Sequence, residues 1–580
     1  MTDVNQLITD HLDIWVAATE KKSSAGRGNG GATSLYGIQR LRELILELAV
    51  RGKLVPQDQD EEPADGLLDR LHFQQSQMFA KGFIKKPKPL AKITKTEIPF
   101  ELPRGWTWCR VSQLGHDWGQ KVPKGQFTYI DVGSINKELG LVSEPTVLEA
   151  SKAPSRARKL VRNGTVVYST VRPYLLNIAV ITETFEPEPI ASTAFAIVHP
   201  FDGISASYLY RYFRSPTFIS YVEGCQTGIA YPAINDKQFF SGLVPLPPTE
   251  EQLRIVAKVD ELMALCDALE HQAEDSLKAH QTLVETCLAT LTNSQSHEEL
   301  TQNWTRIEAH FDTLFTTEDS LSSLWKIILK LAIRGSLVPQ NETEGSASQL
   351  LRSIAAKKEV LISNGRLRKS KALKVINEDE APFTLPNGWA WSRLNDFIDV
   401  RDGTHDSPKD ANGTNTFPLV TSKNFKNGDI DFDSARRISA ADHFEISKRS
   451  RVEQDDILFS MIGGNLGNQV MVRTDEVFSV KNVALFKYYD KTQSIPEFVK
   501  LYMENLAVDL QSQASGGAQP FVSLGFLRNL MIGVPTIEEQ ERIVAKAREL
   551  ERLIELTRGR ISISTASSVE LADTLTSKIH

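Results

Sequence analysis

Two short stretches of the chain carry apolar residues at the spacing of one helix face. The first holds Leu41, Leu44, Ile45, Leu48 and Ala49, and the second holds Ile327, Ile328, Leu331 and Ala332. Each stretch ends in Arg-Gly and is followed closely by Leu-Val-Pro. We therefore predict two helices that end where Gly52 and Gly335 take the left-handed conformation. Pro56 and Pro339 then prevent each helix from continuing.

Two longer amphipathic stretches predict long helices. The first runs from Thr249 to about Leu291, which is roughly 60 Å at 1.5 Å per residue. Its heptad seam is weakened toward the end by Ser276 and His280, and consists of Ile255, Val259, Leu262, Cys266, Leu269 and Ala273. The second runs from Thr536 to about Lys578, and the two seams most simply pack on each other. Capping boxes are expected at both starts, from Thr249 with Gln252 and from Thr536 with Glu539.

Between these helices lie segments whose pattern is typical of mixed α/β domains. Strand-like runs occur in both segments, at Thr165–Val171, Ile178–Thr182 and Thr193–His199, and at Ile457–Ile462, Gln469–Arg473 and Val483–Tyr489. The two sets share a few positions, but most of their side chains differ. We expect one scaffold that carries two different surfaces.

The helices belong to a duplication that covers most of the chain. Segments in the first half recur in the same order in the second half: Leu41–Gln57 matches Leu324–Gln340, Glu97–Leu114 matches Glu380–Phe397, and Glu250–Leu262 matches Glu538–Leu550. The first pair is identical at 11 of 17 positions. Units this long are duplicated modules rather than solenoid repeats.

The end of the chain stops short of a complete second copy. After Thr292 the first copy continues through 303–315 into the second short helix, whereas His580 ends the chain. The N-terminal residues 2–20 are the remaining segment that can take this part. We infer a circular, pseudo-two-fold arrangement, in which the Gly/Ser-rich insert 21–34 is a flexible linker.

The predicted fold is α/β of the mixed α+β kind, with two globular domains joined by two long helices. Its predicted parts are an N-terminal helical segment (1–57), a basic connector (58–98), a first globular domain (99–247), a central long and short helix (248–346), a second basic connector (347–381), a second globular domain (382–535) and a C-terminal long helix (536–580).

Composition describes an ordinary soluble protein, with 41% hydrophobic and 24% charged residues. No apolar run is long enough to span a bilayer, and the start lacks the pattern of a secretory signal. Free thiols in a reducing cytoplasm are expected, because the four cysteines are scattered and are not repeated between the copies. A net charge of −7 argues only weakly against binding to nucleic acid, since the basic residues cluster.

The motifs of common enzymes are missing from the sequence. It contains no GxxxxGK[ST] phosphate loop, no HExxH, no GxSxG, no paired cysteines, and no Asn- or Asp-Pro-Pro-aromatic tetrapeptide. The glycine pairs Gly463–Gly464 and Gly516–Gly517 are more typical of turns than of phosphate cradles. We expect no catalytic residue, metal site or cofactor in this chain.

Basic clusters are the main candidates for function. They comprise Lys152, Arg156, Arg158, Lys159, Arg162 and Arg172 in the first domain; Lys423, Lys426, Arg436, Arg437, Lys448, Arg449 and Arg451 in the second; and the matched triplets Lys85, Lys86, Lys88 and Arg368, Lys369, Lys371 in the connectors. Such density suits DNA phosphates, although solvated faces carry similar patterns.

Aromatic and amide side chains add two further candidates. Tyr231 and Gln519 occupy matching Gly- and Pro-flanked loops, where a changed side chain on a repeated backbone could read bases. A structural role is the ordinary interpretation of a loop tyrosine. The pairs Trp106/Trp108 and Trp389/Trp391 lie two residues apart, which favours core packing over base stacking.

These motifs together resemble the specificity subunit of type I restriction-modification systems. The resemblance rests on ILELAVRGKLVPQ and IILKLAIRGSLVPQ, PFELPRGWTW and PFTLPNGWAW, P-x-x-EEQ-x-RIVAK in both copies, and the strands VVYSTVRPYLLNIAV and IASTAFAIV. It implies two target-recognition domains separated by antiparallel helices, each domain reading one half of a split site in double-stranded DNA. It also implies that the helix pair sets the spacing between the halves.

The resemblance places the chemistry in partner subunits. Two modification subunits would methylate adenine with S-adenosylmethionine, and two restriction subunits would translocate and cut DNA with ATP and magnesium. Three alternatives remain open from the sequence. They are a targeting subunit of a type IIB or related system, a self-contained enzyme with an unusual site, and a coiled-coil scaffold that does not touch DNA.

Overall fold

The computed structural model describes residues 4–21, 33–87, 89–228, 231–369, 373–513 and 521–577. It divides into two compact units, Met1–Ser276 with Ile563–His580, and Leu277–Ser562. The division falls inside the two long helices, α8 (Thr249–Asn293) and α17 (Ile537–Ser577). In α8 it falls at Ser276, where the heptad seam weakens. Both predicted long helices are confirmed to within a residue or two.

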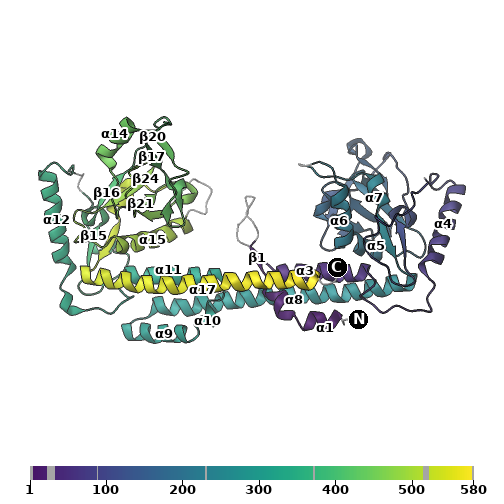
Figure 1. The fold of residues 1–580 in the computed structure, drawn as a ribbon, viewed down its shortest axis with the longest axis horizontal. Coiled ribbons are helices and arrows are strands. Elements are labelled where there is room, and N and C mark those ends of the chain that lie inside the picture. The colour runs from purple at the N-terminus through teal and green to yellow at the C-terminus, as the bar shows by residue number, and fades with distance from the viewer. Residues whose placement is uncertain are drawn as a thin grey trace. The chain divides into compact units, whose positions relative to one another are not determined.

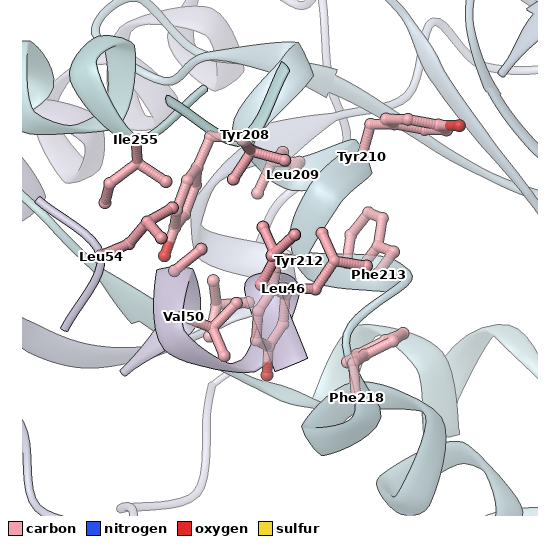
Figure 2. Close-up of a cluster of buried hydrophobic side chains, with 14 of the residues drawn as sticks. Leu46, Val50, Leu54, Tyr208, Leu209, Tyr210, Tyr212, Phe213, Phe218 and Ile255 are labelled. Carbon is pink, nitrogen blue, oxygen red and sulfur yellow. The ribbon is translucent and has the colours of Figure 1, made fainter. Parts of the chain in front are cut away.

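The first unit combines a helical base with a globular region. Its helices are α1 (Val4–Thr9), α2 (Leu12–Ala17), α3 (Tyr36–Val50), α4 (Ala64–Ala80), α5 (Ala206–Phe213), α6 (Pro216–Cys225), α7 (Asp236–Ser241) and the first part of α8. Figure 2 shows how the two parts join, with side chains of α3 and α5 turned toward one another. Leu46, Val50, Tyr208 and Tyr212 are all buried there, and Ile255 of α8 completes the cluster.

Two four-stranded sheets form the globular region of the first unit. One has the order β11 (Ile178–Val180), β10 (Val166–Ser169), β13 (Phe195–Pro200), β4 (Gly115–His116), and the other β8 (Thr146–Leu148), β5 (Phe127–Ile130), β12 (Pro189–Ser192), β9 (Ala157–Leu160). β5 and β12 are parallel, and the remaining pairs are antiparallel. Short pairs join β3 (Thr107–Arg110) to β14 (Leu243–Leu246) and β6 (Ile135–Asn136) to β7 (Leu141–Val142).

The second unit repeats this plan. Its helices are the last part of α8, then α9 (His297–Ala309), α10 (Phe311–Leu314), α11 (Glu318–Ile333), α12 (Ala347–Ser363), α13 (Leu394–Phe397), α14 (Ala440–Ser450), α15 (Pro496–Gln513), α16 (Leu524–Asn529) and the first part of α17. Figure 1 shows α15 facing α11 and α17 beneath the sheets of this unit. Leu329, Phe498 and Ile543 share one buried cluster there, which seats the globular region on its helices.

The strand order of the second globular region matches that of the first, except that its smaller sheet contains no counterpart of β9 among the described residues. Its main sheet runs β22 (Gln469–Met471), β21 (Ile457–Ser460), β24 (Val483–Lys487), β16 (Asp399–Asp402), and its smaller sheet β20 (Arg436–Ser439), β17 (Thr416–Val420), β23 (Ser479–Val480). As in the first unit, the smaller sheet contains one parallel pair, β17 with β23. The short pairs are β15 (Ala390–Arg393) with β25 (Met531–Val534) and β18 (Phe425–Lys426) with β19 (Asp429–Ile430). The predicted common scaffold is confirmed.

Both short helices end at the predicted glycines. Gly52 and Gly335 have φ of +65° and +68°. A Cβ on Gly52 would overlap Cγ of Pro103, and one on Gly335 would lie 2.6 Å from Cγ of Pro386. The two positions therefore need glycine for conformation and for space.

The predicted capping boxes are wrong in the first copy and half formed in the second. Thr249 already lies within α8, because the Gln252 N–H donates to the Pro248 carbonyl. The Thr249 hydroxyl does not cap the helix and donates to the Gly203 carbonyl. Thr536 does cap α17, accepting from the Glu539 N–H at 3.3 Å. The Glu539 carboxylate accepts from Gln340 Nε2 at 2.6 Å rather than returning to the cap.

The first described helices and the last part of α17 share one buried cluster, as the circular arrangement predicts, through Ile8, Trp15 and Ala572. In the first unit Tyr36 of α3 donates to Asp573 of α17 at 2.7 Å, and Arg40 lies 2.9 Å from the same carboxylate. Trp15 of α2 is fully buried against this base. Of the predicted linker, residues 22–32 lie outside the described residues, and its two ends pair as β1 (Glu20–Lys21) and β2 (Thr33–Ser34).

Both connectors contain a helix that was not predicted from the sequence. α4 and α12 are each 17 residues long. They begin with equivalent hydrogen bonds: the Ala64 N–H donates to the Gly105 carbonyl and the Ala347 N–H donates to the Gly388 carbonyl, both at 2.8 Å. Leu67, Leu71 and Ile354 are buried. The signal for these helices was present, since Leu67 and Leu71, like Leu350 and Ile354, are four residues apart.

Candidate nucleic-acid interface

The same polar contacts stabilise each globular region where its first and last strands pair, β3 with β14 and β15 with β25. Arg110 donates to the Ser241 carbonyl at 2.7 Å, and Arg393 to the Asn529 carbonyl at 2.8 Å. Both arginines are 6% exposed and also reach a glutamate, Glu97 in the first unit and Glu380 in the second. The hydrogen-bond donors of these guanidiniums are used inside the protein, and the two arginines are therefore not available to DNA.

The repeated tryptophans also belong to this frame. Trp106 is buried and donates from Nε1 to Glu251 of α8 at 2.9 Å. Burial is the main cause that raises the pKa of Glu251, against the effect of that hydrogen bond. Trp108 and Trp391 pack on Phe100 and Phe383 with ring centroids 5.0 Å apart in both cases. The prediction that the tryptophan pairs serve packing is confirmed.

One loop in each region follows an inner strand of the main sheet. In the first unit it follows β10, and in the second it follows β21. Its backbone turns twice through the left-handed region in both copies, at Arg172 (φ +48°) and Leu176 (φ +52°), and at Gly463 (φ +77°) and Gly467 (φ +84°). Arg172 is equivalent to Gly463 and Leu176 to Gly467 in the repeat, so the conformation recurs although the residues differ.

A second segment pairs with this loop in the same manner in both units. The Ile234 N–H donates to the Thr170 carbonyl at 3.0 Å, and the Val522 N–H to the Met461 carbonyl at 2.9 Å. In the first unit this segment presents Tyr231, which is 69% exposed. In the second it presents Phe521, which is 62% exposed. Gln519, the predicted counterpart of Tyr231, lies outside the described residues.

Arg172 and Tyr231 lie together. The Arg172 guanidinium carbon is 4.8 Å from the centroid of the Tyr231 ring. The surrounding side chains of the loop are exposed as well, Tyr174 at 50% and Leu175 at 37%. The structure thus brings two of the predicted site residues together, with Tyr231 exposed and Arg172 half-buried.

The other basic candidates of the first region fall into two groups. Lys152, Arg156 and Arg162 are exposed, and Arg162 lies over the Trp118 ring at 3.8 Å. Arg158 is half-buried and donates to the Ala157 carbonyl at 2.7 Å. Lys159 is buried and binds the Phe195 carbonyl at 2.6 Å and Asp236 at 3.0 Å. The Lys159 ammonium is therefore used internally, and we leave it out of the proposed DNA surface.

Acidic partners hold most of the basic candidates in the second region. The pairs are Lys426 with Asp431, Arg436 with Asp410, Lys448 with Glu445, and Arg449 with Asp402. Arg437 donates to both the hydroxyl and the backbone carbonyl of Thr416. Lys423 and Arg451 are exposed and have no ion pair within the described ranges. The solvated-face interpretation fits more of this cluster than of the first.

The connector lysines and arginines that the structure describes are exposed. These are Lys85, Lys86, Arg368 and Lys369. Lys88 and Lys371, the third members of the two triplets, lie outside the described residues, as does the Gly516–Gly517 pair.

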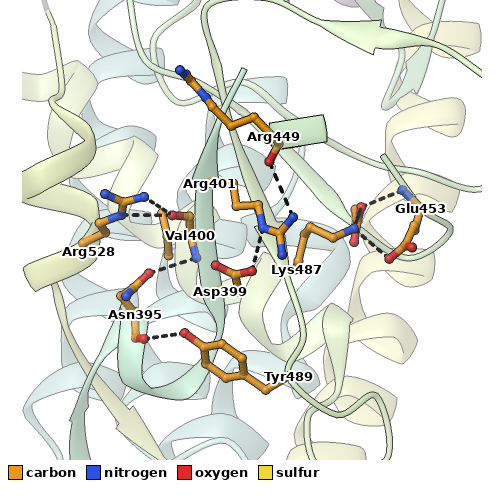
Figure 3. A network of polar contacts seen from close by, with 10 residues as sticks. Asn395, Asp399, Val400, Arg401, Arg449, Glu453, Lys487, Tyr489 and Arg528 are labelled. Atoms are coloured by element: carbon orange, nitrogen blue, oxygen red, sulfur yellow. Dashed lines mark hydrogen bonds and ion pairs between the residues drawn. The ribbon is translucent and has the colours of Figure 1, made fainter. Parts of the chain in front are cut away.

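A polar network that was not predicted from the sequence supports the edge strand β16 (Figure 3). Arg528 donates to the Val400 carbonyl at 2.9 Å, and Arg401 bonds Asp399 at 2.6 Å. Beyond it the buried Lys487 ammonium lies 2.6 Å from Asp456 and 2.9 Å from Glu453. Burial raises the pKa of Asp456 to about 6, even against the attraction of Lys487.

An exposed histidine sits just past the end of the same strand. His405 Nε2 is 2.8 Å from Asp402, and its Nδ1 is 3.1 Å from Oδ1 of Asn482. These two contacts raise the pKa of His405, the one to Asn482 most. The ring is held by two acceptors, which favours its charged form.

Nothing in the described part of the chain resembles a metal centre or a membrane span. Groups of three or more His, Cys, Asp or Glu side chains able to hold a metal ion do not occur there. None of the helices described is long and apolar enough to cross a membrane.

Comparison with known proteins gives one consistent result. The family model of the type I restriction modification DNA specificity domain matches residues 386–563. The chain is 34% identical over 594 residues to the type I restriction enzyme EcoAI specificity subunit of Escherichia coli, and 33% identical over 601 residues to the EcoEI specificity subunit of the same organism. Each alignment covers 99% of both chains.

A solved structure supports the fold. A chain from a study titled "Structural basis underlying complex assembly and conformational transition of the type I R-M system" superposes with a TM-score of 0.51 at 21% identity, over 83% of this chain and 99% of that one. The family itself is decided by the identity to the two curated relatives, which extends over nearly their whole length. The chain belongs to the specificity subunits of type I restriction enzymes, the non-catalytic subunits that give such systems their DNA specificity.

Proposed function

We propose that each globular region reads one half of an asymmetric, bipartite site in double-stranded DNA. The observation that carries this proposal is that the two regions share the strand order of their main sheets but expose different side chains from equivalent loops. Arg172 and Tyr231 in one region correspond to Gly463 and Gln519 in the other. Base edges in the major groove differ in their donors and acceptors, so different side chains select different sequences.

The exposed cations would fix the register on the phosphates. Five cations are exposed and form no ion pair among the described residues: Lys152, Arg156 and Arg162 in the first region, and Lys423 and Arg451 in the second. Phosphate contacts give affinity that depends on salt and is independent of sequence. The regions also differ beside some of these cations, because Arg156 and Arg162 flank β9 in the first region, whereas Arg451 follows α14 in the second.

The long helices would set the spacing between the half-sites. α8 has 45 residues and α17 has 41, which correspond to about 68 Å and 62 Å of helix at 1.5 Å per residue. One turn of B-DNA is about 34 Å, so recognition elements on such helices can address grooves a turn or more apart.

The same helices would dock two modification subunits. Exposed leucines recur at equivalent positions of the two long helices, Leu265 (40% exposed) with Leu553 (42%) and Leu283 (51%) with Leu571 (49%). Each unit therefore presents one such leucine from α8 and one from α17. Two matching apolar positions suit two copies of one partner. Restriction subunits would join this assembly in the cytoplasm, with S-adenosylmethionine, ATP and magnesium bound by the partners.

Methylation mapping tests the proposal directly. Cells that carry this chain and its modification subunit should methylate adenine in one bipartite sequence with two unlike halves and a fixed gap. A contiguous or palindromic target would contradict the assignment of one half-site to each region.

A further inference from the structure

We propose that Arg172, held by Tyr231, reads a guanine in the half-site recognised by the first globular region. This inference rests on the proposed function and assigns one base contact within it. It starts from a backbone conformation that arginine rarely adopts.

Arg172 occupies a position for which the second copy uses glycine. Its φ of +48° and ψ of 57° lie in the left-handed region, where Cβ is crowded against the backbone. Gly463 takes the equivalent conformation without that strain, at φ +77°. The arginine therefore does not stand there for the sake of the turn.

The surrounding structure holds the strained residue in place. The Arg172 N–H donates to the Pro232 carbonyl at 2.8 Å, and its carbonyl accepts from the Leu175 N–H at 3.0 Å. Val171 and Ala233 form an isolated bridge between the two segments. Strained residues that are held in this way concentrate at binding sites, because the strain keeps a side chain in its working position.

The guanidinium is positioned but keeps its hydrogen-bonding capacity. It makes no hydrogen bond or ion pair with any residue that the structure describes, and it rests on the face of the Tyr231 ring at 4.8 Å. A cation–π contact orients the planar group and uses none of its N–H donors. The two donors that match O6 and N7 of guanine thus remain free.

The contrast with Arg162 favours a base over a phosphate for Arg172. Arg162 also lies over an aromatic ring, but Trp118 is half-buried and packs edge-on against His116 at 4.6 Å. Arg172 is itself half-buried, but its ring partner Tyr231 and its loop neighbours Tyr174 and Leu175 are exposed. An element that enters a groove must project in this way, whereas a phosphate contact can lie flat on the domain.

The test uses the assembled complex of this chain with its modification subunits. Five variants are compared with the native chain: Arg172→Ala, Arg172→Lys, Arg172→Gly, Tyr231→Phe and Tyr231→Ala. Methylation of a library of sites is measured, together with competition binding and the melting temperature of the complex. Arg162→Ala is the matched control, since it removes an arginine that also lies on a ring in the same region.

All three Arg172 variants should relax the choice of base at one position in one half-site, by about tenfold to a hundredfold, and leave the other half-site unchanged. Arg172→Lys should not restore selectivity, because an ammonium cannot make the paired contact. Arg172→Gly should melt no lower than the native complex, because glycine relieves the backbone strain. Tyr231→Phe should behave as native, and Tyr231→Ala should relax the same position as Arg172→Ala.

Two results would overturn the inference. One is unchanged base choice in Arg172→Ala and Arg172→Gly while the native complex selects its site. The other is equal weakening on all sequences, which is the expected behaviour of Arg162→Ala and marks a phosphate contact. If the native complex itself shows no bipartite selectivity, the proposed function fails, and that result is distinct from both.

Discussion

Single residues in this chain are fixed by very local geometry. Gly52 has a positive φ, and the space where a Cβ would stand is taken by Pro103. Gly105 also has a positive φ, +87°, but nothing lies within 4 Å of its virtual Cβ. The two glycines separate the effect of conformation from that of crowding.

Gly52→Ala should therefore destabilise the chain more than Gly105→Ala. Gly105→Ala introduces only the strained φ, which costs on the order of 1 kcal/mol of unfolding free energy. Gly52→Ala adds an overlap with Pro103, which brings the expected loss to roughly 2–4 kcal/mol. Denaturant unfolding of both variants measures the difference. Equal losses would show that the space around Gly52 relaxes freely.

Asp456 predicts a pH dependence of stability. Its pKa rises from 3.8 to about 6 on folding, mainly because the carboxyl is buried. A carboxyl whose pKa is raised stabilises the folded state below its unfolded pKa and loses that contribution as the pH rises through the folded value. Native chain should therefore lose stability relative to Asp456→Asn between pH 4 and 7, by roughly 3 kcal/mol at most. A difference that stays constant over this range would count against a raised pKa.

The long helices are predicted well by the sequence, because their apolar residues recur at a regular spacing. The heptad seam of α8 is buried from Ile255 to Cys266, because a regular apolar spacing has only one face to bury. Cys266 shares its buried cluster with Ala572 of α17 in the first unit, and Leu288 shares one with Ile554 in the second. Strand positions were also predicted. The helices α4 and α12 were missed, because the basic residues near them are typical of a connector.

Lengthening both long helices should widen the gap in the DNA site. Four residues inserted after Ala273 and after its equivalent Ile561 add about 6 Å to each helix, which is close to two base-pair steps. Methylation mapping should show both half-sites intact and the gap longer. Insertion in the Gly/Ser-rich segment 21–34 serves as the control and should leave the gap as it is.

The exposed leucines of the helices make a second prediction. Leu265→Glu combined with Leu571→Glu alters only the first unit and should lower the number of bound modification subunits from two to one, since a charge cannot be buried against an apolar partner surface. Native mass spectrometry of the complex gives the count. Leu277→Glu, at an exposed α8 leucine whose equivalent in α17 is Thr565, is the matched control. Two bound subunits in the double variant would place the docking surface elsewhere.

At the scale of the whole molecule, two regions with one topology are joined by a pair of long helices. Exchange of residues 99–247 for the matching region of a relative should change one half-site only. The other half-site and the gap should persist, because β15, β25 and the helices that seat the second region are untouched. Methylation mapping of the chimera provides the measurement, and a change in both halves would mean that the regions do not read independently.

The sequence by itself determined the repeat, the long helices, the glycine stops and the family, because these depend on spacing and residue type along the chain. Only the tertiary structure decided which basic residues are available. Lys159 and Arg162 are close neighbours in the sequence, yet one is buried on Asp236 and the other is exposed on Trp118. Likewise, Arg172 and Tyr231 are far apart in the sequence and meet only because two segments pair. Charge in a sequence is local, whereas the partner that neutralises or orients it comes from elsewhere in the chain.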